Sequence, residues 1–363
     1  MNANILEIVV LQKNSGVASF VMNVYRHIDH EQVSVEFLTW IIDDSLPTYN
    51  EEIYNWGGKV HVIPYYRKHP LQFIQEAEKV IASKRFSAIH CHEFLISLPM
   101  LYFAKKHNIF MRIAHSHNPD IESTLKKLLV KLCRSFFKRY STMFMACSKE
   151  SGEFLFGNDV NIIIIKNGID VQKFEFSEKK RNTLRERFNL QNKFVIGNIG
   201  RLVTQKNQLF LLDIFAQVLQ EKKNAILLII GDGNQKRLLK QRAEDLLIQK
   251  QVFFLGVRED VADLLNVMDV FTLTSIYEGL GIVLVESQAN GLPCIASDVI
   301  PKEVKMSENF SFLPLDAPIS EWSKQILNSS RIISSQAKSN VIFAGYDIHN
   351  SAKKLQEIYL SSV

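Results

Sequence analysis

The sequence predicts an α/β protein of two domains, each built on a doubly wound parallel β-sheet. Short β-branched runs alternate with longer helical patterns, as they do in βαβ units. The rhythm restarts after a turn signal at 166–170 (Lys-Asn-Gly-Ile-Asp) and a charged stretch at 178–181. The 363 residues also exceed what one core comfortably holds and suit two domains of about 150 to 200 residues.

In the first half of the chain, runs rich in β-branched residues mark strands, and the stretches between them have helical spacing. We expect helices at Ala18–Ile28, Leu71–Lys84 and Leu98–Lys106. The expected strands are Ile5–Leu11, Val33–Trp40, Lys59–Ile63, Ala88–Cys91, Phe110–Ala114, Thr142–Ala146 and Ile162–Ile165.

The second half repeats this pattern and ends in a helix, Ser351–Leu360, that no strand follows. Two successive sheets of this kind place a ligand where the carboxyl ends of their strands face each other, across a central cleft. The expected strands are Phe194–Ile199, Ala225–Ile230, Val252–Phe254, Val270–Thr272, Cys294–Ala296 and Ser311–Leu313.

Composition predicts a folded cytoplasmic protein. Hydrophobic residues make up 47% and charged residues 22% of the chain, which is ordinary for a soluble globular protein. The four cysteines lie far apart without paired spacing, so we expect reduced thiols. No basic segment precedes the short apolar run at the N-terminus, and no stretch approaches the ~18 apolar residues of a spanning helix. We therefore expect a chain that is neither secreted nor membrane-spanning.

The net charge of +5 is concentrated at 121–140, where six basic residues stand against Glu122. Within this segment, Leu125–Tyr140 has leucines and phenylalanines at helical spacing between the basic residues. Such a helix could lie on an anionic membrane surface; the alternative is an ordinary amphipathic helix packed on the core. Nucleic acid is not expected as a partner, because the phenylalanines would not face phosphate and no binding motif appears.

The strongest motif is 275–286 (Ser-Ile-Tyr-Glu-Gly-Leu-Gly-Ile-Val-Leu-Val-Glu), which follows one expected strand and opens a helix. Two glycines at such a turn let the backbone approach a ligand and direct N–H groups at an anion. Glu278 and Glu286 lie eight residues apart, at most about two helical turns. Beside an anion site, such carboxylates suit hydrogen bonds from sugar hydroxyls; the alternative is a glycine-rich helix start with two solvated glutamates.

A second motif, 200–207 (Gly-Arg-Leu-Val-Thr-Gln-Lys-Asn), directly follows the strand expected at Phe194–Ile199. Arg201 and Lys206 therefore leave the carboxyl edge of the sheet, where ligands bind. The planar fork of an arginine and the compact charge of a lysine suit a diphosphate. A surface loop with two solvated cations is the alternative.

Together the two motifs resemble those of the retaining GT-B glycosyltransferases of family 4 (group 1), which combine a Glu-x7-Glu motif with a Gly-Arg…Lys loop. The likeness is to bacterial enzymes that build capsular and exopolysaccharide repeat units. It extends to the first loop at 14–16, a histidine motif at 112–118, a hinge at 167–170 and a base-binding loop at 255–260. One departure is that Ser15 stands where the family has the first of two adjacent glycines.

The resemblance implies the GT-B fold, two Rossmann-like doubly wound domains. Residues 1–168 with the C-terminal helix 346–363 would bind the acceptor, and residues 169–345 the nucleotide-sugar donor. It implies transfer of a sugar from a nucleotide diphosphate donor, a UDP-sugar, to a glycan or lipid-linked acceptor with retention of anomeric configuration, as in capsular and exopolysaccharide synthesis. The alternatives are a sugar-nucleotide epimerase on the same fold and a non-catalytic nucleotide-binding partner of a transferase.

The resemblance also implies the roles of single residues. Arg201 and Lys206 would neutralise the diphosphate, Glu278 would accept from sugar hydroxyls, and His115 would reach the donor sugar, with His117 as the alternative. The catalytic set is Arg201, Lys206, Glu278 and His115. The donor-binding set is Gly16, Val257, Arg258, Gly279, Leu280, Gly281 and Glu286, with Glu286 on the ribose and Val257 and Arg258 along the base.

No metal or other cofactor is expected, because these cations and a helix N-terminus would stabilise the departing diphosphate and no Asp-x-Asp is present. His90, His92, His115 and His117 invite a metal-site interpretation. Against it stand the alternation of side chains along a strand and a spacing narrower than usual for zinc. We expect these histidines to line the carboxyl edge of the first sheet. Gly231-Asp232-Gly233 lacks the third glycine of a dinucleotide fingerprint and reads as a turn.

Overall fold

A computed structural model describes residues 2–13, 15–84, 86–117, 124–331 and 335–362. The chain forms two compact units, Met1–Ile169 with Asp347–Val363, and Asp170–Tyr346. The chain passes from one unit to the other between Ile169 and Asp170 and returns before Asp347. Ile169 and Asp347 are the residues of the first unit at the two crossings, and they pair in a parallel bridge. The chain therefore leaves the first unit and re-enters it at the same place. The acceptor and donor roles of the units stay a prediction.

Within the described part of the first unit, a seven-stranded parallel sheet has the order β3-β2-β1-β4-β5-β6-β7. Chain order therefore reverses between β1 and β4, which makes their carboxyl ends the switch point of the sheet. The strands are β1 Ala3–Ile8, β2 Val33–Thr39, β3 Lys59–Val62, β4 Ala88–Cys91, β5 Met111–Ser116, β6 Met143–Ala146 and β7 Ile162–Ile164.

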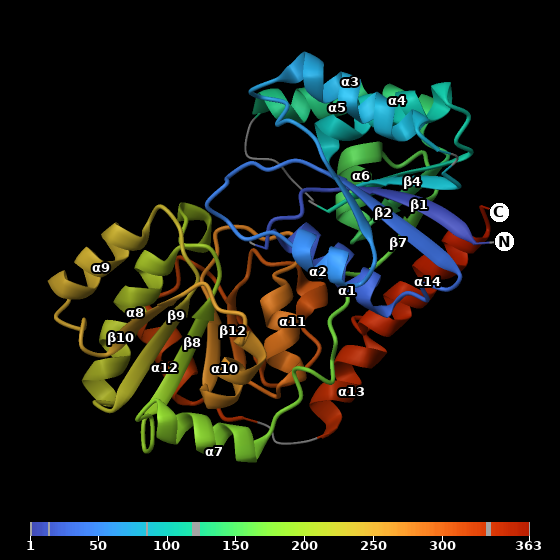
Figure 1. The fold of residues 1–363 in the computed structure, drawn as a ribbon. Coiled ribbons are helices and arrows are strands. Elements are labelled where there is room, and N and C mark those ends of the chain that lie inside the picture. The colour runs from blue at the N-terminus through green and yellow to red at the C-terminus, as the bar shows by residue number, and fades with distance from the viewer. Residues whose placement is uncertain (1, 14, 85, 118–123, 332–334, 363) are drawn as a thin grey trace. The chain divides into compact units, whose positions relative to one another are not determined.

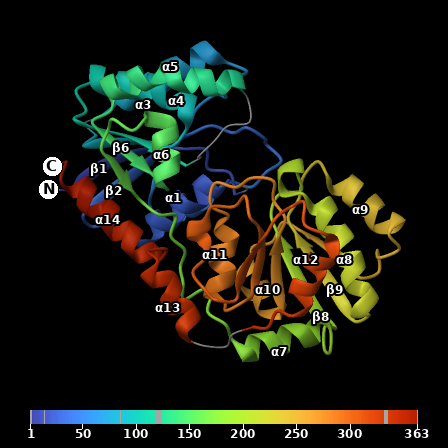
Figure 2. The same cartoon turned by 180° about the vertical axis from the view of Figure 1, so that it is seen from behind.

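Helices cover both faces of this sheet, with α1 and α14 on one face and α3, α4 and α5 on the other (Figure 1, Figure 2). Each face has its own apolar core: Phe20, Val21 and Leu355 belong to the first, and Phe73, Met100 and Phe137 to the second. The helices of the unit are α1 Gly16–His27, α2 Asn50–Asn55, α3 Pro70–Ala82, α4 Phe94–Lys106, α5 Thr124–Tyr140, α6 Lys149–Phe156 and α14 Ile348–Leu360.

The second unit repeats the plan with a six-stranded parallel sheet, as far as its residues are described, in the order β10-β9-β8-β11-β12-β13. Its switch point lies between β8 and β11. Its strands are β8 Phe194–Ile199, β9 Ala225–Ile230, β10 Val252–Gly256, β11 Val270–Leu273, β12 Cys294–Ser297 and β13 Phe310–Leu313. Its helices are α7 Glu178–Arg187, η1 Thr204–Lys206, α8 Gln208–Glu221, α9 Lys236–Asp245, α10 Val261–Val267, α11 Ile282–Ala289, η2 Lys302–Val304, α12 Ile319–Leu327 and α13 Ser335–Phe343.

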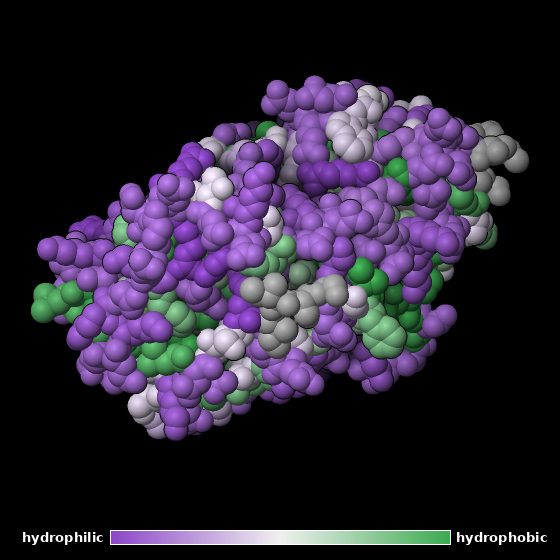
Figure 3. Space-filling model, turned by 90° about the horizontal axis from the view of Figure 1, so that it is seen from below, coloured by the Kyte–Doolittle hydropathy of each residue, from purple (hydrophilic) through white to green (hydrophobic). Residues whose placement is uncertain are grey.

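The predicted fold class is confirmed: both sheets are parallel, and helices alternate with the strands along the chain. The face of the molecule in Figure 3 carries mostly hydrophilic residues, and the hydrophobic ones form small separate groups. Along the described chain, no helix combines the length and the apolar character that crossing a bilayer requires. Cys91, Cys133, Cys147 and Cys294 are free thiols.

Candidate active site

The two strongest motifs meet at the switch point of the second sheet. The loop 200–207 follows β8, the loop 274–281 follows β11, and these two strands are neighbours in the sheet. Because the strands are parallel, both loops leave the same carboxyl edge. In open α/β sheets this crevice is where ligands bind. Sheet order therefore brings together two segments that stand about 70 positions apart in the sequence.

Hydrogen bonds hold the two loops to each other. The N–H of Ile276 donates to the carbonyl of Gln205 at 2.8 Å, and the Gln205 amide donates to the carbonyl of Tyr277 at 2.9 Å. At the base of the loops, the buried Thr274 hydroxyl donates to the carbonyl of Asn207 at 3.0 Å. The side chains that the loops carry are thus fixed relative to each other.

Lys206 and Glu278 form the centre of this edge. Lys206 Nζ donates to Glu278 Oε1 at 2.5 Å, and Ser275 Oγ donates to the same oxygen at 2.5 Å. The two charged side chains are only 13% and 7% exposed, so their attraction is screened less than that of a surface pair. A lysine ammonium has three N–H donors, which leaves Lys206 able to bind an anion while Glu278 holds it in place.

Further anion-binding groups surround this pair. Arg201 is exposed, and within the described residues its guanidinium has no hydrogen-bond or ion-pair partner. Gly281 adopts φ +75° as the N-cap of α11, a left-handed conformation that favours glycine. The backbone N–H groups of Gly279, Leu280 and Gly281 likewise have no partner among the described residues, and α11 begins directly after them. A helix N-terminus with free amides attracts a phosphate.

Glycines let the segments that follow β8 and β9 approach each other closely. Gly231 follows β9 at φ +134°, and a Cβ there would lie 2.0 Å from the carbonyl oxygen of Gly200. A Cβ on Gly233 would lie 2.3 Å from the carbonyl oxygen of Leu202. The segment Gly231-Asp232-Gly233 therefore serves as a turn packed against the cation-bearing loop, and its glycines are required by space.

The predicted base-binding loop follows β10 on the same edge. Gly256 accepts a hydrogen bond from the N–H of Gly231 at 2.8 Å, which joins this loop to the one after β9. Val257 is 63% exposed. The Arg258 guanidinium binds both carboxylate oxygens of Asp260, at 2.8 and 2.6 Å. Because the guanidinium is bound to Asp260, the backbone groups of Val257 and Arg258 are the groups of this loop that can contact a base.

Glu286 lies in the second turn of α11 and is largely buried. Burial raises the pKa of its carboxyl from 4.5 to about 7, against the opposing effect of Lys173. A carboxyl group that is poorly solvated gains from hydrogen-bond donors such as ribose hydroxyls. The two acids of the motif thus differ: Glu278 is paired with Lys206, and Glu286 is not.

This raised pKa predicts how stability depends on pH. Between 4.5 and about 7 the folded protein keeps a proton on Glu286 that the unfolded chain has lost, so the free energy of unfolding falls as pH rises. Glu286→Gln removes this dependence. We expect the variant to gain stability relative to the wild type as pH rises through that window, measured by urea unfolding. Glu321→Gln, at an exposed position, serves as the control; parallel curves for the Glu286 variant and the wild type would contradict the assignment.

In the first unit, the predicted residue His115 belongs to a buried group of four histidines. His90 and His92 come from the end of β4, and His115 and His117 from the end of β5. Ring centroids lie 4.1 Å apart within the first pair and 4.2 Å apart within the second. The four rings lie beside the switch point of the first sheet, at its carboxyl edge as predicted.

The argument from strand alternation was wrong for this group. Residues two apart in a strand share a face, and His90 and His92 accordingly point the same way, with their rings in contact. Ligand atoms of His90, His92 and His115 lie within 4.8 Å of one another. Hydrogen bonds nevertheless engage both ring nitrogens of His90 and His92. The absence of a metal stays a prediction.

Two residues of this group were missed at the sequence level. Glu7 is a buried carboxylate in β1, and the buried Tyr359 comes from the C-terminal helix α14; both are hydrogen-bonded into the histidine group. Glu7 carries a signal that could have been read, since it is the one charged residue in the apolar run 5–11. Tyr359 carries none, because nothing local links the last helix to the first strand.

In the predicted first loop, Ser15 replaces a glycine of the family pattern, and its role as a helix cap explains the replacement. Ser15 is the N-cap of α1, and its hydroxyl accepts from the N–H of Ala18 at 3.3 Å. Serine is a favoured residue at this position. Gly16 is exposed at the first position of the helix, with open space around its Cα. Asn14 and Asn118, which belong to the predicted motifs, lie outside the described residues.

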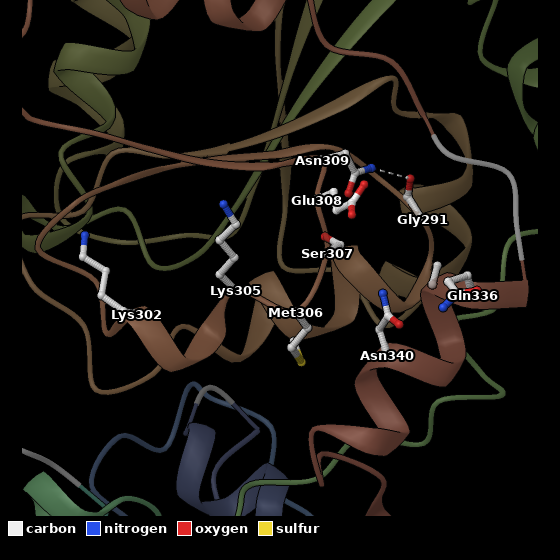
Figure 4. Close-up of a pocket in the computed structure, with 10 residues that line it drawn as sticks. Gly291, Lys302, Lys305, Met306, Ser307, Glu308, Asn309, Gln336 and Asn340 are labelled. Atoms are coloured by element: carbon white, nitrogen blue, oxygen red, sulfur yellow. Dashed lines mark hydrogen bonds between the residues drawn. The ribbon is translucent and has the colours of Figure 1, made fainter.

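An open groove of about 850 Å³ lies elsewhere on the second unit (Figure 4). Gly291 and Asn309, which precede β12 and β13, mark one side of it, and the Asn309 amide donates to the Gly291 carbonyl at 3.4 Å. Lys302 and Lys305 line another part, and Gln336 and Asn340 of α13 lie on the side of Gly291. None of the predicted donor-binding residues lines this groove.

Two family models match the chain and divide it as the fold does. The model "Glycosyltransferase Family 4" matches residues 14–173, and the model "Glycosyl transferases group 1" matches residues 180–311. The second match spans every segment of the second-unit site, and the first spans the four histidines. Together the two matches take in most of the chain.

Similar proteins and solved structures support the same family. The chain is 29% identical to "Putative glycosyltransferase EpsF" of Bacillus subtilis (strain 168), covering 98% of this chain and 96% of that protein. It is 26% identical to the UDP-Gal:alpha-D-GlcNAc-diphosphoundecaprenol alpha-1,3-galactosyltransferase of Escherichia coli, covering 78% of each. Among solved structures, HepE of Anabaena in complex with UDP matches with a TM-score of 0.82 at 19% identity, over the full length of both chains. The chain belongs to the family 4, group 1 glycosyltransferases and has their GT-B fold.

Proposed function

We propose that this enzyme transfers a hexosyl residue from a UDP-sugar to a glycan or lipid-linked acceptor, with retention of anomeric configuration, in capsule or exopolysaccharide synthesis. Several likenesses support this proposal. The Escherichia coli relative is named for a UDP-Gal donor and a diphosphoundecaprenol acceptor, and HepE was solved with UDP. Another relative, 24% identical over 86% of both chains, is the capsular polysaccharide biosynthesis glycosyltransferase CapH of Staphylococcus aureus.

One observation carries the assignment of the donor site: the Lys206–Glu278 pair at the carboxyl edge of β8 and β11. A buried ammonium, held by a carboxylate and flanked by an exposed arginine and free amides, is a site for a diphosphate. We assign the phosphates to Arg201, Lys206 and the amides of 279–281. Glu278 then accepts from sugar hydroxyls beside the phosphates.

The remaining residues of the site complete this assignment. Glu286 accepts from the ribose hydroxyls, and the backbone of Val257 and Arg258 lies along the base. His115 is assigned to the donor sugar, and Gly16 to donor binding.

Cleavage of the anomeric bond leaves charge on the departing diphosphate. Cations and dipoles that are already in place stabilise such charge without reorganisation, so Lys206 and the start of α11 lower the barrier. We propose that the leaving phosphate takes the proton of the attacking hydroxyl on the same face of the sugar. No metal or other cofactor takes part in this scheme.

The test is turnover with a panel of UDP-, GDP- and ADP-sugars, with and without polyprenyl-diphosphate-linked sugars. We expect release of UDP that depends on the acceptor. An interconverted donor without release of UDP would identify an epimerase, and nucleotide binding without any turnover would identify a non-catalytic partner; either result overturns the proposal.

We further propose that α5 binds an anionic membrane surface at the cytoplasmic face, where a lipid-linked acceptor is found. The helix has two apolar faces. Val130 and Phe137 are buried against the unit, whereas Leu128 and Leu132 are 55% and 68% exposed. Lys131 is exposed beside these leucines. Exposed leucines next to basic residues are the composition of an interfacial helix, with about 1 kcal/mol contributed per basic residue near anionic lipid.

The leucine pair supplies the sharpest test of this surface. We expect the wild type to float with vesicles that contain phosphatidylglycerol and the variant Leu128→Asp/Leu132→Asp to stay in solution, because the change removes the inserted groups. Leu247→Asp, at a position that is 83% exposed on the second unit, is the matched control. Equal flotation of the double variant and the wild type, or no flotation of the wild type, would contradict membrane binding through α5.

A further inference from the structure

A buried hydrogen-bond network starts from one carboxylate, Glu7, at the switch point of the first sheet. Glu7 is 5% exposed and holds two branches that end at His115 and His117. Burial opposes ionisation of Glu7, but the adjacent His90 and His92 hold the pKa of its carboxyl well below the ordinary value. Glu7 is therefore ionised and can only accept hydrogen bonds. With neutral imidazole rings, this constraint determines where every proton in the network lies.

The first branch runs through His92. Its Nε2 lies 2.7 Å from Glu7 Oε2 and must donate, because the carboxylate cannot. Burial lowers the pKa of His92 to about 4, so the ring is neutral and its Nδ1 carries a lone pair. That nitrogen lies 2.8 Å from His117 Nε2, which must therefore donate. In a neutral His117, the proton on Nε2 leaves Nδ1 unprotonated.

The second branch runs through Tyr359 and His90. The Tyr359 hydroxyl donates to Glu7 Oε1 at 2.6 Å, so its oxygen accepts from His90 Nδ1 at 2.6 Å. In a neutral His90, the proton on Nδ1 leaves the lone pair on Nε2, which accepts from His115 Nδ1 at 3.0 Å. The proton on His115 Nδ1 leaves its Nε2 unprotonated.

Both branches end in nitrogens that the described protein leaves without a partner. His115 Nε2 and His117 Nδ1 have no hydrogen-bond partner among the described residues. Both atoms are buried, and the two residues are only 3% and 9% exposed. Burial, together with the neighbouring histidines, lowers the pKa of both rings well below the ordinary value. Two buried polar atoms without partners are costly unless a ligand satisfies them.

We propose that Glu7 fixes the tautomers of four histidines, so that His115 Nε2 and His117 Nδ1 together accept hydrogen bonds from hydroxyl groups of a sugar substrate. His117 is thus a second binding residue, and Glu7, His90, His92 and Tyr359 are positioning residues. The identity of the ligand as a sugar rests on the glycosyl transfer proposed above. The tautomers do not, because they follow from the network alone.

The tautomers are measured directly by ¹⁵N NMR of protein labelled at histidine, with peaks assigned by His→Gln variants. In the wild type without any ligand, we expect His115 protonated at Nδ1 and His117 at Nε2. A proton on His115 Nε2 or on His117 Nδ1 overturns the proposal. So does one equivalent of Zn²⁺ that binds through His90, His92 and His115, because their ring nitrogens are then metal ligands.

The variant Glu7→Gln tests whether Glu7 fixes the tautomers of His115 and His117. Its amide has one oxygen and one NH₂ group, and the NH₂ group must donate into one branch. Every proton along that branch then shifts to the opposite nitrogen, and either His115 Nε2 or His117 Nδ1 becomes a donor. We expect one of the two tautomers to reverse; unchanged tautomers in a folded variant contradict the proposal.

Two control variants separate this effect from general disturbance. Glu36→Gln alters another buried glutamate that accepts from a histidine, His61, at 2.7 Å, and it should leave His115 and His117 unchanged. Tyr359→Phe removes one link, but His90 Nδ1 still lies 3.3 Å from Glu7 Oε1. Both tautomers should therefore persist in this variant, and a reversal would show that Glu7 does not set them.

The consequence for catalysis is a loss of sugar binding with intact nucleotide binding. Turning one acceptor into a donor should lower kcat/KM with the donor roughly 10- to 100-fold, as expected for one unsatisfied buried hydrogen bond. The affinity for UDP alone should not change. If the Glu7→Gln variant has a reversed tautomer but wild-type kcat/KM, His115 and His117 do not bind the sugar as proposed. If the wild type shows no turnover, the proposed function is wrong, and the NMR experiment alone decides the tautomers.

Discussion

Lys206→Ala is expected to lower kcat for sugar transfer about 10²- to 10³-fold, the effect of removing one preorganised group from a developing charge. Among the described cations of the site, Lys206 is the least exposed, and its 2.5 Å bond to Glu278 fixes it in place. The charge on the diphosphate grows as the anomeric bond breaks, so the loss should appear in kcat. Steady-state kinetics with the donor sugar identified by the panel measure it.

The variant also leaves Glu278 without its cation, so stability must be measured beside activity. Ser275 Oγ still donates to Glu278, which limits the damage. Lys206→Arg keeps the charge and should retain more activity than Lys206→Ala. Lys222→Ala is the control: this lysine stacks on the ring of Phe194 at the amino end of β8, away from the carboxyl edge. Equal kcat for Lys206→Ala and Lys222→Ala would remove Lys206 from the catalytic set.

Gly231→Ala is expected to cost about 2 to 4 kcal/mol in the free energy of unfolding and to abolish nucleotide binding. The residue has φ +134°, which a side chain rarely tolerates, and the new Cβ would lie 2.0 Å from the carbonyl oxygen of Gly200. That oxygen belongs to the backbone at the end of β8 and cannot rotate away. The loop that carries Arg201 and Lys206 must therefore shift.

Gly256→Ala separates backbone strain from the clash. Gly256 also has positive φ, +71°, but a Cβ there meets nothing within 4 Å. This variant should lose only about 1 kcal/mol, the cost of the left-handed conformation. Urea unfolding of the two variants measures both costs. Equal destabilisation would show that the close approach of Gly231 to Gly200 contributes nothing.

Much of the fold was predictable because parallel strands and their helices leave strong local patterns. Each expected strand overlaps an observed one, and β4, β8 and β9 match to the residue. The ends of the other strands shift by a few residues in either direction: β5 continues past the apolar run to Ser116, whereas β1 ends at Ile8, before its apolar run does. The motifs at 200–207 and 275–286 were readable for the same reason, because each follows a strand directly.

Contacts that depend on sheet order were not predictable from local pattern. The Lys206–Glu278 pair exists because β8 and β11 are neighbours, and no property of either motif encodes that neighbourhood. The Glu7 network draws on β1, β4, β5 and α14, which are spread over the whole chain. The outward face of α5 was hidden too, because Leu132 and Phe137 look alike in a helical pattern while only Phe137 is buried.

The central claim is that the carboxyl edge of β8 and β11 holds the nucleotide diphosphate. Hydrogen–deuterium exchange of the whole protein, with and without UDP, tests it most directly. We predict slower exchange on addition of UDP in peptides that cover 200–207 and 275–286. Protection confined to the groove at Lys302–Asn309, with both loops unchanged while UDP is bound, would contradict the account.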